Sequence, residues 1–516
     1  MAAKKDWSYW DKAMFLGVET LDLKKVTWAI SGLRSASINA TDDSGNTALM
    51  LAAKIGDASI VHELIQYKAD IHARNNAGEN ALIVAAAAGN EEIVKIFLEK
   101  GLNINSRAAN GDTALIAAAR SGKGKVVEQL IQSRANIVAR NQSKKDAFEE
   151  ALANYARPSA RSAQGEAILQ LLKAGYRPDP SLNAIPFLVA IRHPDAAKIL
   201  VSDSQQNLDA VDSTGRTALV HAIDTKQEDL ALSLLSKGAR MDSGFYHPLF
   251  STAYTDEIRV ASALLSKSAD VNMRKSEGET PLWIATQLRN SSVAKLLLQN
   301  GANPNLRKKD GAFPLVFAVQ SDDADLVQLL LEKGADVEAR MNPKDSSALS
   351  KVMDRSGSSI PSRIANHLIK GGADIRALNS SHETALMWAI KNNYLDVVKL
   401  LLEKNAALEA KNPAGQAALA FAIFYDRKEA IELLLTAGAN PNAQTADGST
   451  ALMWAVHKND RDLVKFILSK KPDLNIRNKK GRTALTESYL EKYVQNFEII
   501  NDLVSAGADP NTHPNC

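Results

Sequence analysis

Cysteine is almost absent from this sequence of 516 residues: the chain has one, Cys516, and it is the last residue. A single cysteine excludes an internal disulfide and a metal site built from cysteines. Its position also excludes prenylation, which needs three residues after the modified cysteine. We interpret Cys516 as an exposed thiol without a function, and such a low cysteine content fits any redox compartment.

Long apolar runs and an excess of one charge are missing as well. No apolar stretch reaches the roughly 18 residues of a membrane-spanning helix, and the N-terminal segment lacks the apolar core of a signal peptide. As written, the sequence predicts a cytoplasmic protein; a signal removed earlier, or export that needs none, would fit the periplasm or the cell exterior instead. The net charge of +3 gives no general attraction to nucleic acid or membranes.

What the sequence does contain is a recurring segment, Thr-Ala-Leu-Met-Trp-Ala, at 384–389 and again at 450–455. The interval is twice 33 residues, and a Thr-Ala-Leu-like triplet marks the shorter period along most of the chain. The second residue of each triplet is Ala or Pro, and the third is Leu or Phe. The triplets begin at 47, 80, 113, 146, 185, 217, 247, 280, 313, 347, 384, 417, 450 and 483. This regularity predicts a stack of small repeated units.

Each part of the unit has a physical interpretation. Thr, Asn, Asp or Ser at the first triplet position accepts hydrogen bonds at a helix start, and Pro is tolerated at the first helical position. A Gly two residues earlier suits a turn with positive φ. The alanines after the Leu let neighbouring helices approach closely, and a second amphipathic helix follows, as in 91–100. One unit therefore predicts a turn, a short helix, a longer helix and a polar connector.

The pattern resembles the ankyrin repeat, which has the same 33-residue unit; residues 278–307 are close to its consensus. The resemblance covers roughly 41–516 and implies an all-α solenoid of about fourteen helix-turn-helix repeats. The family often has His directly after the triplet, whereas here that position is never His. We therefore interpret the Met-Trp pairs of the recurring segment as packing residues, in preference to a ligand-binding site built from tryptophan.

Residues 1–40 resemble a degenerate first repeat and are predicted to cap the stack. Trp7 and Trp10 beside it either cover the terminal core, which we favour, or form a contact surface through which an otherwise monomeric protein self-associates. Extra residues near 154–166, 353–362 and 489–497 interrupt the period. We expect surface loops there, either on a binding face or as neutral insertions.

The sequence has no arrangement of residues that predicts catalysis. The histidines lack the spacing of metal ligands, no Gly-rich phosphate loop follows a strand, and no nucleophile with its base is apparent. We therefore expect a protein that is not an enzyme and that needs no metal or cofactor.

Two columns of residues remain as candidate surfaces. The first is a basic ladder just before the turns, which either binds an anionic partner or pairs internally with acidic turn residues; we favour internal pairing. Its members are Arg74, Arg107, Arg140, Arg274, Arg307, Arg340, Lys411 and Arg477.

The second column is the end of each first helix, which is polar in most repeats. Phe424 and Tyr425 depart from this, and the equivalent positions one repeat away hold Lys391 and the pair His457 and Lys458. Aromatic anchors inside a basic rim have the composition of binding hot spots.

Tyr246 and Tyr254 form a second, weaker candidate. We expect a scaffold whose concave face binds one or more partner proteins, with no nucleic acid involved. An exported effector, or an inhibitor or immunity-type protein that blocks another enzyme, would use the same mode of binding, and the basic ladder leaves an anionic ligand as a further alternative.

Overall fold

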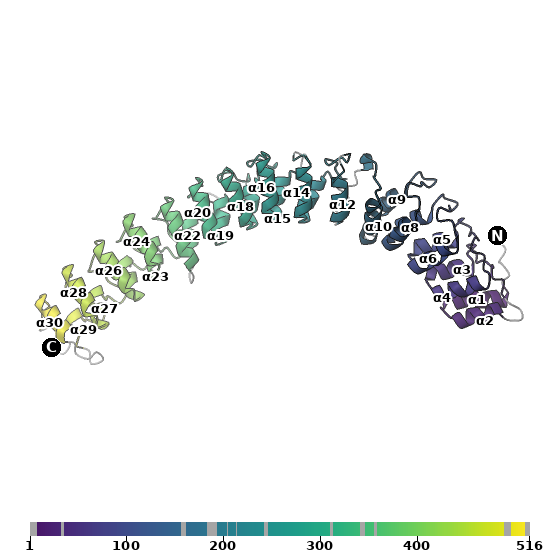
Figure 1. The fold of residues 1–516 in the computed structure, drawn as a ribbon. Coiled ribbons are helices and arrows are strands. Elements are labelled where there is room, and N and C mark those ends of the chain that lie inside the picture. Colours follow the sequence, from purple (N-terminus) through teal and green to yellow (C-terminus); the bar gives the residue numbers. More distant parts are fainter. Residues whose placement is uncertain are drawn as a thin grey trace. The chain divides into compact units, whose positions relative to one another are not determined.

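The structure is a computed structural model in which helices follow one another in antiparallel pairs (Figure 1). It describes residues 8–31, 36–155, 161–182, 193–203, 205–212, 214–241, 246–309, 313–340, 346–355, 359–489 and 497–510. Within these ranges there are 29 α-helices and no strand, only isolated β-bridges and a 3-10 turn at Pro180–Leu182. The prediction of an all-α fold is confirmed.

The chain forms two compact units, an N-terminal unit of Met1–Ser251 and a C-terminal unit of Thr252–Cys516, and each is described by itself. Apart from α1, the first helix of each described pair is shorter than the second. These first helices are α1 (Tyr9–Glu19), α3 (Ala48–Ile55), α5 (Ala81–Ala88), α7 (Ala114–Arg120), α9 (Ala147–Tyr155), α13 (Ala218–Asp224), α15 (Pro248–Thr255), α17 (Pro281–Gln287), α19 (Pro314–Gln320), α21 (Ala348–Met353), α23 (Ala385–Lys391), α25 (Ala418–Phe424), α27 (Ala451–His457) and α29 (Ala484–Glu487).

The second helix of each pair packs against the first. These second helices are α2 (Leu23–Ser31), α4 (Ala58–Gln66), α6 (Glu91–Glu99), α8 (Gly124–Gln132), α10 (Arg161–Lys173), α12 (Pro194–Val201), α14 (Glu228–Ser236), α16 (Ile258–Ser266), α18 (Ser291–Gln299), α20 (Ala324–Glu332), α22 (Ser359–Lys370), α24 (Leu395–Glu403), α26 (Lys428–Thr436), α28 (Arg461–Ser469) and α30 (Phe497–Ser505). The triplet at 185, which precedes α12, lies outside the described residues.

Most triplets start helices as predicted because their first side chain caps the helix; Phe313 and Ala417 make no such bond. The hydroxyl of Thr47 accepts a hydrogen bond of 3.3 Å from the backbone N–H of Met50, the third residue of α3. The same bond caps the helices after Asn80, Thr113, Thr217, Thr280, Ser347, Thr384, Thr450 and Thr483. These caps satisfy N–H groups that a helix start leaves without an internal partner.

The turn before each triplet needs a positive φ angle. Gly45, Gly78 and Gly111 have φ values of 79°, 73° and 82° at this position. Lys144 and His382 occupy the equivalent position in two other repeats, and both have a φ of 58°. A side chain with a Cβ is strained in this region, so these two repeats adopt the turn at a cost in stability.

Alanines on the first helices allow the repeats of a unit to pack closely. Ala52, Ala85 and Ala118, each three residues after the Leu of its triplet, have no exposed surface, and α3, α5 and α7 pack side by side in that order. The core of each unit therefore runs between consecutive helix pairs, as expected for units that cannot bury their apolar face alone.

Where the sequence predicts an N-terminal cap, the structure has the helix pair α1 and α2, and its capping role stays a prediction. Trp7 lies outside the described residues. Trp10 is half-buried. Its ring centroid lies 4.6 Å from the ring centroid of Trp28 and 5.5 Å from that of Tyr9. Tyr9 and Trp28 remain 69% and 47% exposed. The aromatic side chains of the cap therefore form a cluster that is still open to solvent.

The predicted insertions are only partly loops. After residues 156–160, which lie outside the described residues, α10 runs for 13 residues, whereas α8 in the preceding repeat has nine. Gln164 in this extension is buried, so the expectation of a loop is wrong for 161–166. Part of the second insertion extends α22 in the same way, to 12 residues, because extra helix can pack on the neighbouring repeat. Residues 490–496 of the third lie outside the described residues.

Candidate functional site

Charged residues at two equivalent positions form an ion pair within a repeat. One position lies directly before the triplet, and the other, eight residues later, lies at the end of the first helix. We call this a turn-to-helix pair. The three pairs, with their N–O distances, are Asp112 with Arg120 (2.8 Å), Arg216 with Asp224 (3.1 Å) and Glu383 with Lys391 (2.9 Å). Repeats with such a pair neutralise their own charges at this surface.

The basic rim predicted from Lys391 and Lys458 is not a surplus of positive charge. The hydrogen bond from Lys391 to the buried Glu383 raises the pKa of the lysine above its usual value. The ammonium of Lys458 lies 2.8 Å from a carboxylate oxygen of Asp426. Each of the two lysines beside the aromatic residues therefore has a carboxylate partner from a nearby turn, and their part in binding a partner stays a prediction.

Phe424 lies at the end of α25, where the turn-to-helix pair is replaced by Gln416 and the phenyl ring. The ring is 66% exposed. It meets Tyr425 edge to face, with centroids 5.0 Å apart. Tyr425 is half-buried and also contacts Phe421 at 5.7 Å. Phe424 therefore does not belong to the core, while Tyr425 supports it from one side.

Phe424 lines a pocket of about 450 Å³ together with Trp454 and His457 of α27. The two aromatic side chains come from consecutive first helices, and turn residues that include Asp447 and Lys480 complete the lining. The pocket therefore combines a largely apolar wall with polar groups from the connector turns, which is the usual composition of a ligand or partner pocket.

Sequence reasoning missed Trp454, which it assigned to packing together with Trp388. Trp388 is indeed buried, at 2% exposed, and contacts the ring of Tyr394 at 5.1 Å between centroids. Trp454 is only half-buried. One signal could have separated them: the residue equivalent to Tyr394 in the later repeat is Asp460, which caps α28 instead of covering the indole.

Tyr246 belongs to the N-terminal unit and Tyr254 to the C-terminal unit. The guanidinium of Arg216 lies 4.9 Å from the ring centroid of Tyr246. The ammonium of Lys275 lies 4.7 Å from that of Tyr254 and donates to its hydroxyl at 2.9 Å. Each tyrosine is thus half-covered by a cation of its own unit, and their joint role stays a prediction.

The basic ladder contributes to stacking in the N-terminal unit. A guanidinium nitrogen of Arg74 donates to the carbonyl oxygens of Gly78 and, one repeat on, Arg107. In the same way, a guanidinium nitrogen of Arg107 donates to the carbonyl oxygens of Gly111 at 3.0 Å and of Arg140 at 2.6 Å. These arginines therefore bond to backbone carbonyls and tie consecutive turns together, in addition to the acidic contacts that Arg140 makes with Asp146 and Glu149.

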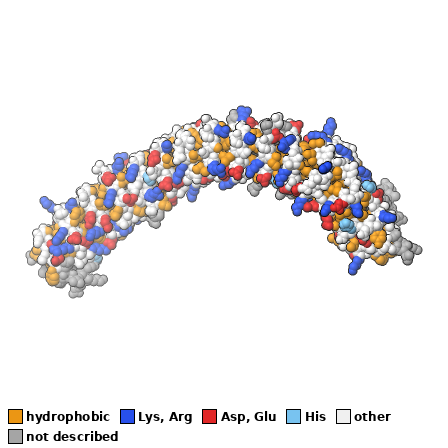
Figure 2. Space-filling view, in the orientation of Figure 1, with side chains coloured by type: hydrophobic (Ala, Val, Ile, Leu, Met, Phe, Trp, Pro, Cys, Tyr) orange, Lys and Arg blue, Asp and Glu red, His pale blue; other side chains and the backbone are white. Residues whose placement is uncertain are grey.

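On the visible face of each unit, basic and acidic side chains alternate without a large patch of one sign (Figure 2). No group of three or more His, Cys, Asp and Glu side chains is placed to hold a metal ion in the part of the chain that the structure describes. Among the same residues, no helix is long and apolar enough to span a membrane.

A family model for ankyrin repeats, in three copies, matches residues 19–108, 49–141, 159–244, 248–341, 358–445 and 431–513. These matches cover most of the chain, which therefore belongs to the ankyrin-repeat family. Repeats of this family are in general protein–protein interaction modules and are typically not enzymes. A search of curated proteins found no match.

Proposed function

We propose that this protein is a non-enzymatic scaffold whose C-terminal unit binds a folded partner protein through Phe424, Tyr425, Trp454 and His457, here called the aromatic surface. The observation that carries the proposal is the exposure of Phe424: a phenyl ring that is 66% exposed stands where other repeats have an ion pair. An apolar side chain of this size beside a second half-exposed aromatic favours an interaction site over a solvated helix end.

The pocket beside the aromatic surface indicates what the partner presents. An apolar side chain of the partner enters between Phe424 and Trp454, where it is removed from water. The ammonium of Lys480 lies at the same pocket and forms no ion pair within the described ranges. An acidic group of the partner pairs with this lysine and not with Lys391 or Lys458, whose charges are already compensated.

The test uses the full chain as bait. A partner recovered by affinity purification and mass spectrometry is produced pure, and its affinity is measured by calorimetry for the wild type and for Phe424→Ala with Tyr425→Ala. We expect the double variant to lose at least about 2 kcal/mol of binding free energy, the usual threshold for a hot spot. The melting temperature of the unbound protein falls only slightly, because Phe424 lies outside the core and Tyr425 is only partly buried.

Phe497→Ala is the matched control. Phe497 lies in the same unit, begins the second helix α30, and is 67% exposed, nearly the same as Phe424. The proposal requires that this variant keep wild-type affinity. Unchanged affinity of the double variant, or an equal loss in the control, overturns the proposed aromatic surface.

A further inference from the structure

One repeat of the N-terminal unit has the acidic half of a turn-to-helix pair without the basic half. Glu79 precedes the triplet of this repeat, as Asp112 and Glu383 precede theirs. Eight residues later the other two repeats have Arg120 and Lys391, whereas this repeat has Ala87. The carboxylate has kept its position, and the cation that neutralises its counterparts is absent.

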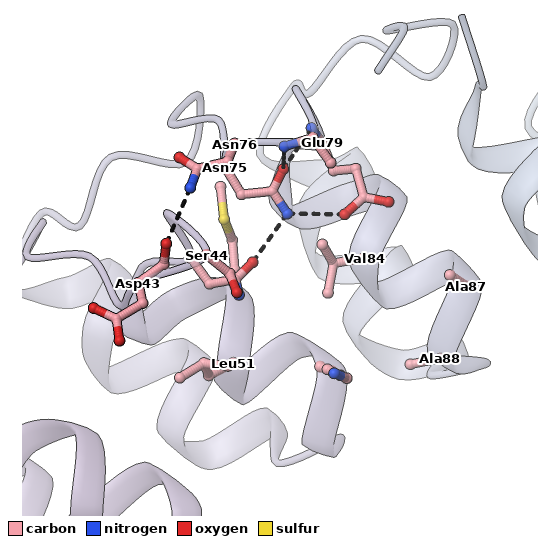
Figure 3. A pocket seen from close by; sticks show the side chains of 13 residues that line it. Asp43, Ser44, Leu51, Asn75, Asn76, Glu79, Val84, Ala87 and Ala88 are labelled. Atoms are coloured by element: carbon pink, nitrogen blue, oxygen red, sulfur yellow. Dashed lines mark hydrogen bonds between the residues drawn. The ribbon is translucent and has the colours of Figure 1, made fainter. Parts of the chain in front are cut away.

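The missing side chain leaves a cavity between α3 and α5. It has a volume of about 820 Å³, and Leu51, Val84, Ala87 and Ala88 form its apolar wall (Figure 3). The connector turns supply a polar rim of asparagines. Asn75 donates to Glu79 at 2.8 Å and to Asn46 at 2.9 Å, and Asn76 donates to the carbonyl of Asp43 at 3.1 Å.

The charges around this cavity are not balanced. Its lining contains the carboxylates of Glu79 and Asp43 and one ammonium, that of Lys54, so the formal charge is −1. Among the described residues, none of these three charged groups has an oppositely charged atom within 4.0 Å. The turn-to-helix pairs, by contrast, all have N–O distances below this limit. The asparagine bond to Glu79 leaves one of its carboxylate oxygens available to a further donor.

We propose that this cavity, the Glu79 pocket, is a binding site for one basic side chain, Arg or Lys, of a partner polypeptide. The aliphatic stem of that side chain packs on Val84 and Ala87, and its charged end donates to Glu79, as Lys391 does to Glu383 within its own repeat. Because the ammonium of Lys54 offsets one of the two carboxylates, a single cation of the partner balances the charge of the site. The Glu79 pocket belongs to the N-terminal unit and shares no residue with the aromatic surface of the C-terminal unit.

The test uses the full-length protein and a random linear peptide library displayed on phage. We expect the selected peptides to share an Arg or Lys, and synthetic copies with citrulline or acetyl-lysine at that position to bind at least about tenfold more weakly. Glu79→Gln weakens binding of the unmodified peptide by a similar factor. This variant retains the fold, because Gln416 occupies the same position in another repeat and an amide oxygen still accepts from Asn75.

Ala87→Arg provides a second measurement. The new guanidinium occupies the Glu79 pocket and pairs with Glu79, so peptide binding is lost while the melting temperature is kept or raised. Phe424→Ala with Tyr425→Ala leaves peptide binding unchanged, which separates this site from the proposed function. Failure to select peptides, selected peptides without a shared basic residue, or wild-type affinity in Glu79→Gln overturns the proposal.

Discussion

The indole nitrogen of Trp388 donates a hydrogen bond of 3.0 Å to the carbonyl oxygen of Arg355, which lies 33 residues earlier in the chain. Arg355 in turn donates through its guanidinium to the carbonyl of Val319 at 2.9 Å. The two hydrogen bonds together thus link three consecutive repeats of the C-terminal unit. Trp454, in the later copy of the same six-residue segment, is half-exposed and lines a pocket instead.

Replacing the two tryptophans should therefore have different consequences. We expect Trp388→Ala to destabilise the C-terminal unit by about 3–5 kcal/mol, because a large buried ring and a satisfied hydrogen bond are both lost. Trp454→Ala should cost less, about 2 kcal/mol, since its ring is already partly exposed to water. Urea unfolding followed by circular dichroism measures both; equal shifts in midpoint would mean that the two rings are equally buried.

Two repeats should gain stability from a glycine. His382 and Lys144 both have a φ of 58° at a turn position that Gly occupies elsewhere. We expect His382→Gly to raise the free energy of unfolding by about 0.5–1 kcal/mol, because relief of the strain exceeds the added entropy of the unfolded chain.

Gly415→Ala is the converse control for this turn. Gly415 has a φ of 77°, and an added Cβ would meet no atom within 4 Å, so the variant isolates the effect of φ. It should be less stable than the wild type. A His382→Gly variant that melts at or below the wild-type temperature would contradict the strain argument.

The hydrogen-bonded carboxylate of Asp212, which lies 2.6 Å from the ring nitrogen of His221, should make the N-terminal unit sensitive to acid. Partial burial alone would raise the pKa of Asp212, but hydrogen bonds from Thr214, His221 and the Arg216 N–H outweigh it and lower the pKa to about 2. Because the folded-state pKa lies below the ordinary value of 3.8, the stabilisation is complete above about pH 4 and is lost as the pH falls through 2.

Asp212→Asn tests this dependence. Asn stands at the equivalent position of other repeats, where Asn379 accepts the same turn hydrogen bonds, so the variant keeps the turn and loses only the charge. We expect it to be less stable than the wild type near neutral pH and about equally stable at about pH 1, below the pKa of Asp212 in both states. Thermal unfolding of both proteins at each pH measures this difference in stability. If the difference stays constant over this range, the charge of Asp212 is not its cause.

Reversing a turn-to-helix pair should be tolerated, since Arg216 and Asp224 already have the opposite order to Glu383 and Lys391. We expect Lys391→Glu to cost about 1–3 kcal/mol, because it places a second carboxylate beside the buried Glu383. Adding Glu383→Lys should recover at least about half of that loss. A double variant no more stable than the single one would show that the pair contributes through its hydrogen bonds alone.

The features of the fold that follow from neighbouring residues were predictable. Thr384 and Thr450 cap their helices, and Gly415 and Gly448 have the positive φ of the turn, because capping and backbone strain depend on a few adjacent residues. The exposure of Phe424 also follows from its register on a short helix. The acidic partners of Lys391 and Lys458 could not be predicted, since they depend on how the turns are placed.

The sequence by itself determined the period, the helix pairs, the caps and the family, since each is repeated or local and needs no knowledge of distant contacts. Only the tertiary structure decided which equivalent residues differ in role. Trp388 is covered by Tyr394 and by the Arg355 carbonyl, whereas Trp454 is only partly buried and lines a pocket. Ala87 leaves a cavity beside Glu79. The physical reason is that burial and charge compensation at one position are set by side chains and backbone from adjoining helices and repeats, and identical segments with different neighbours acquire different surfaces.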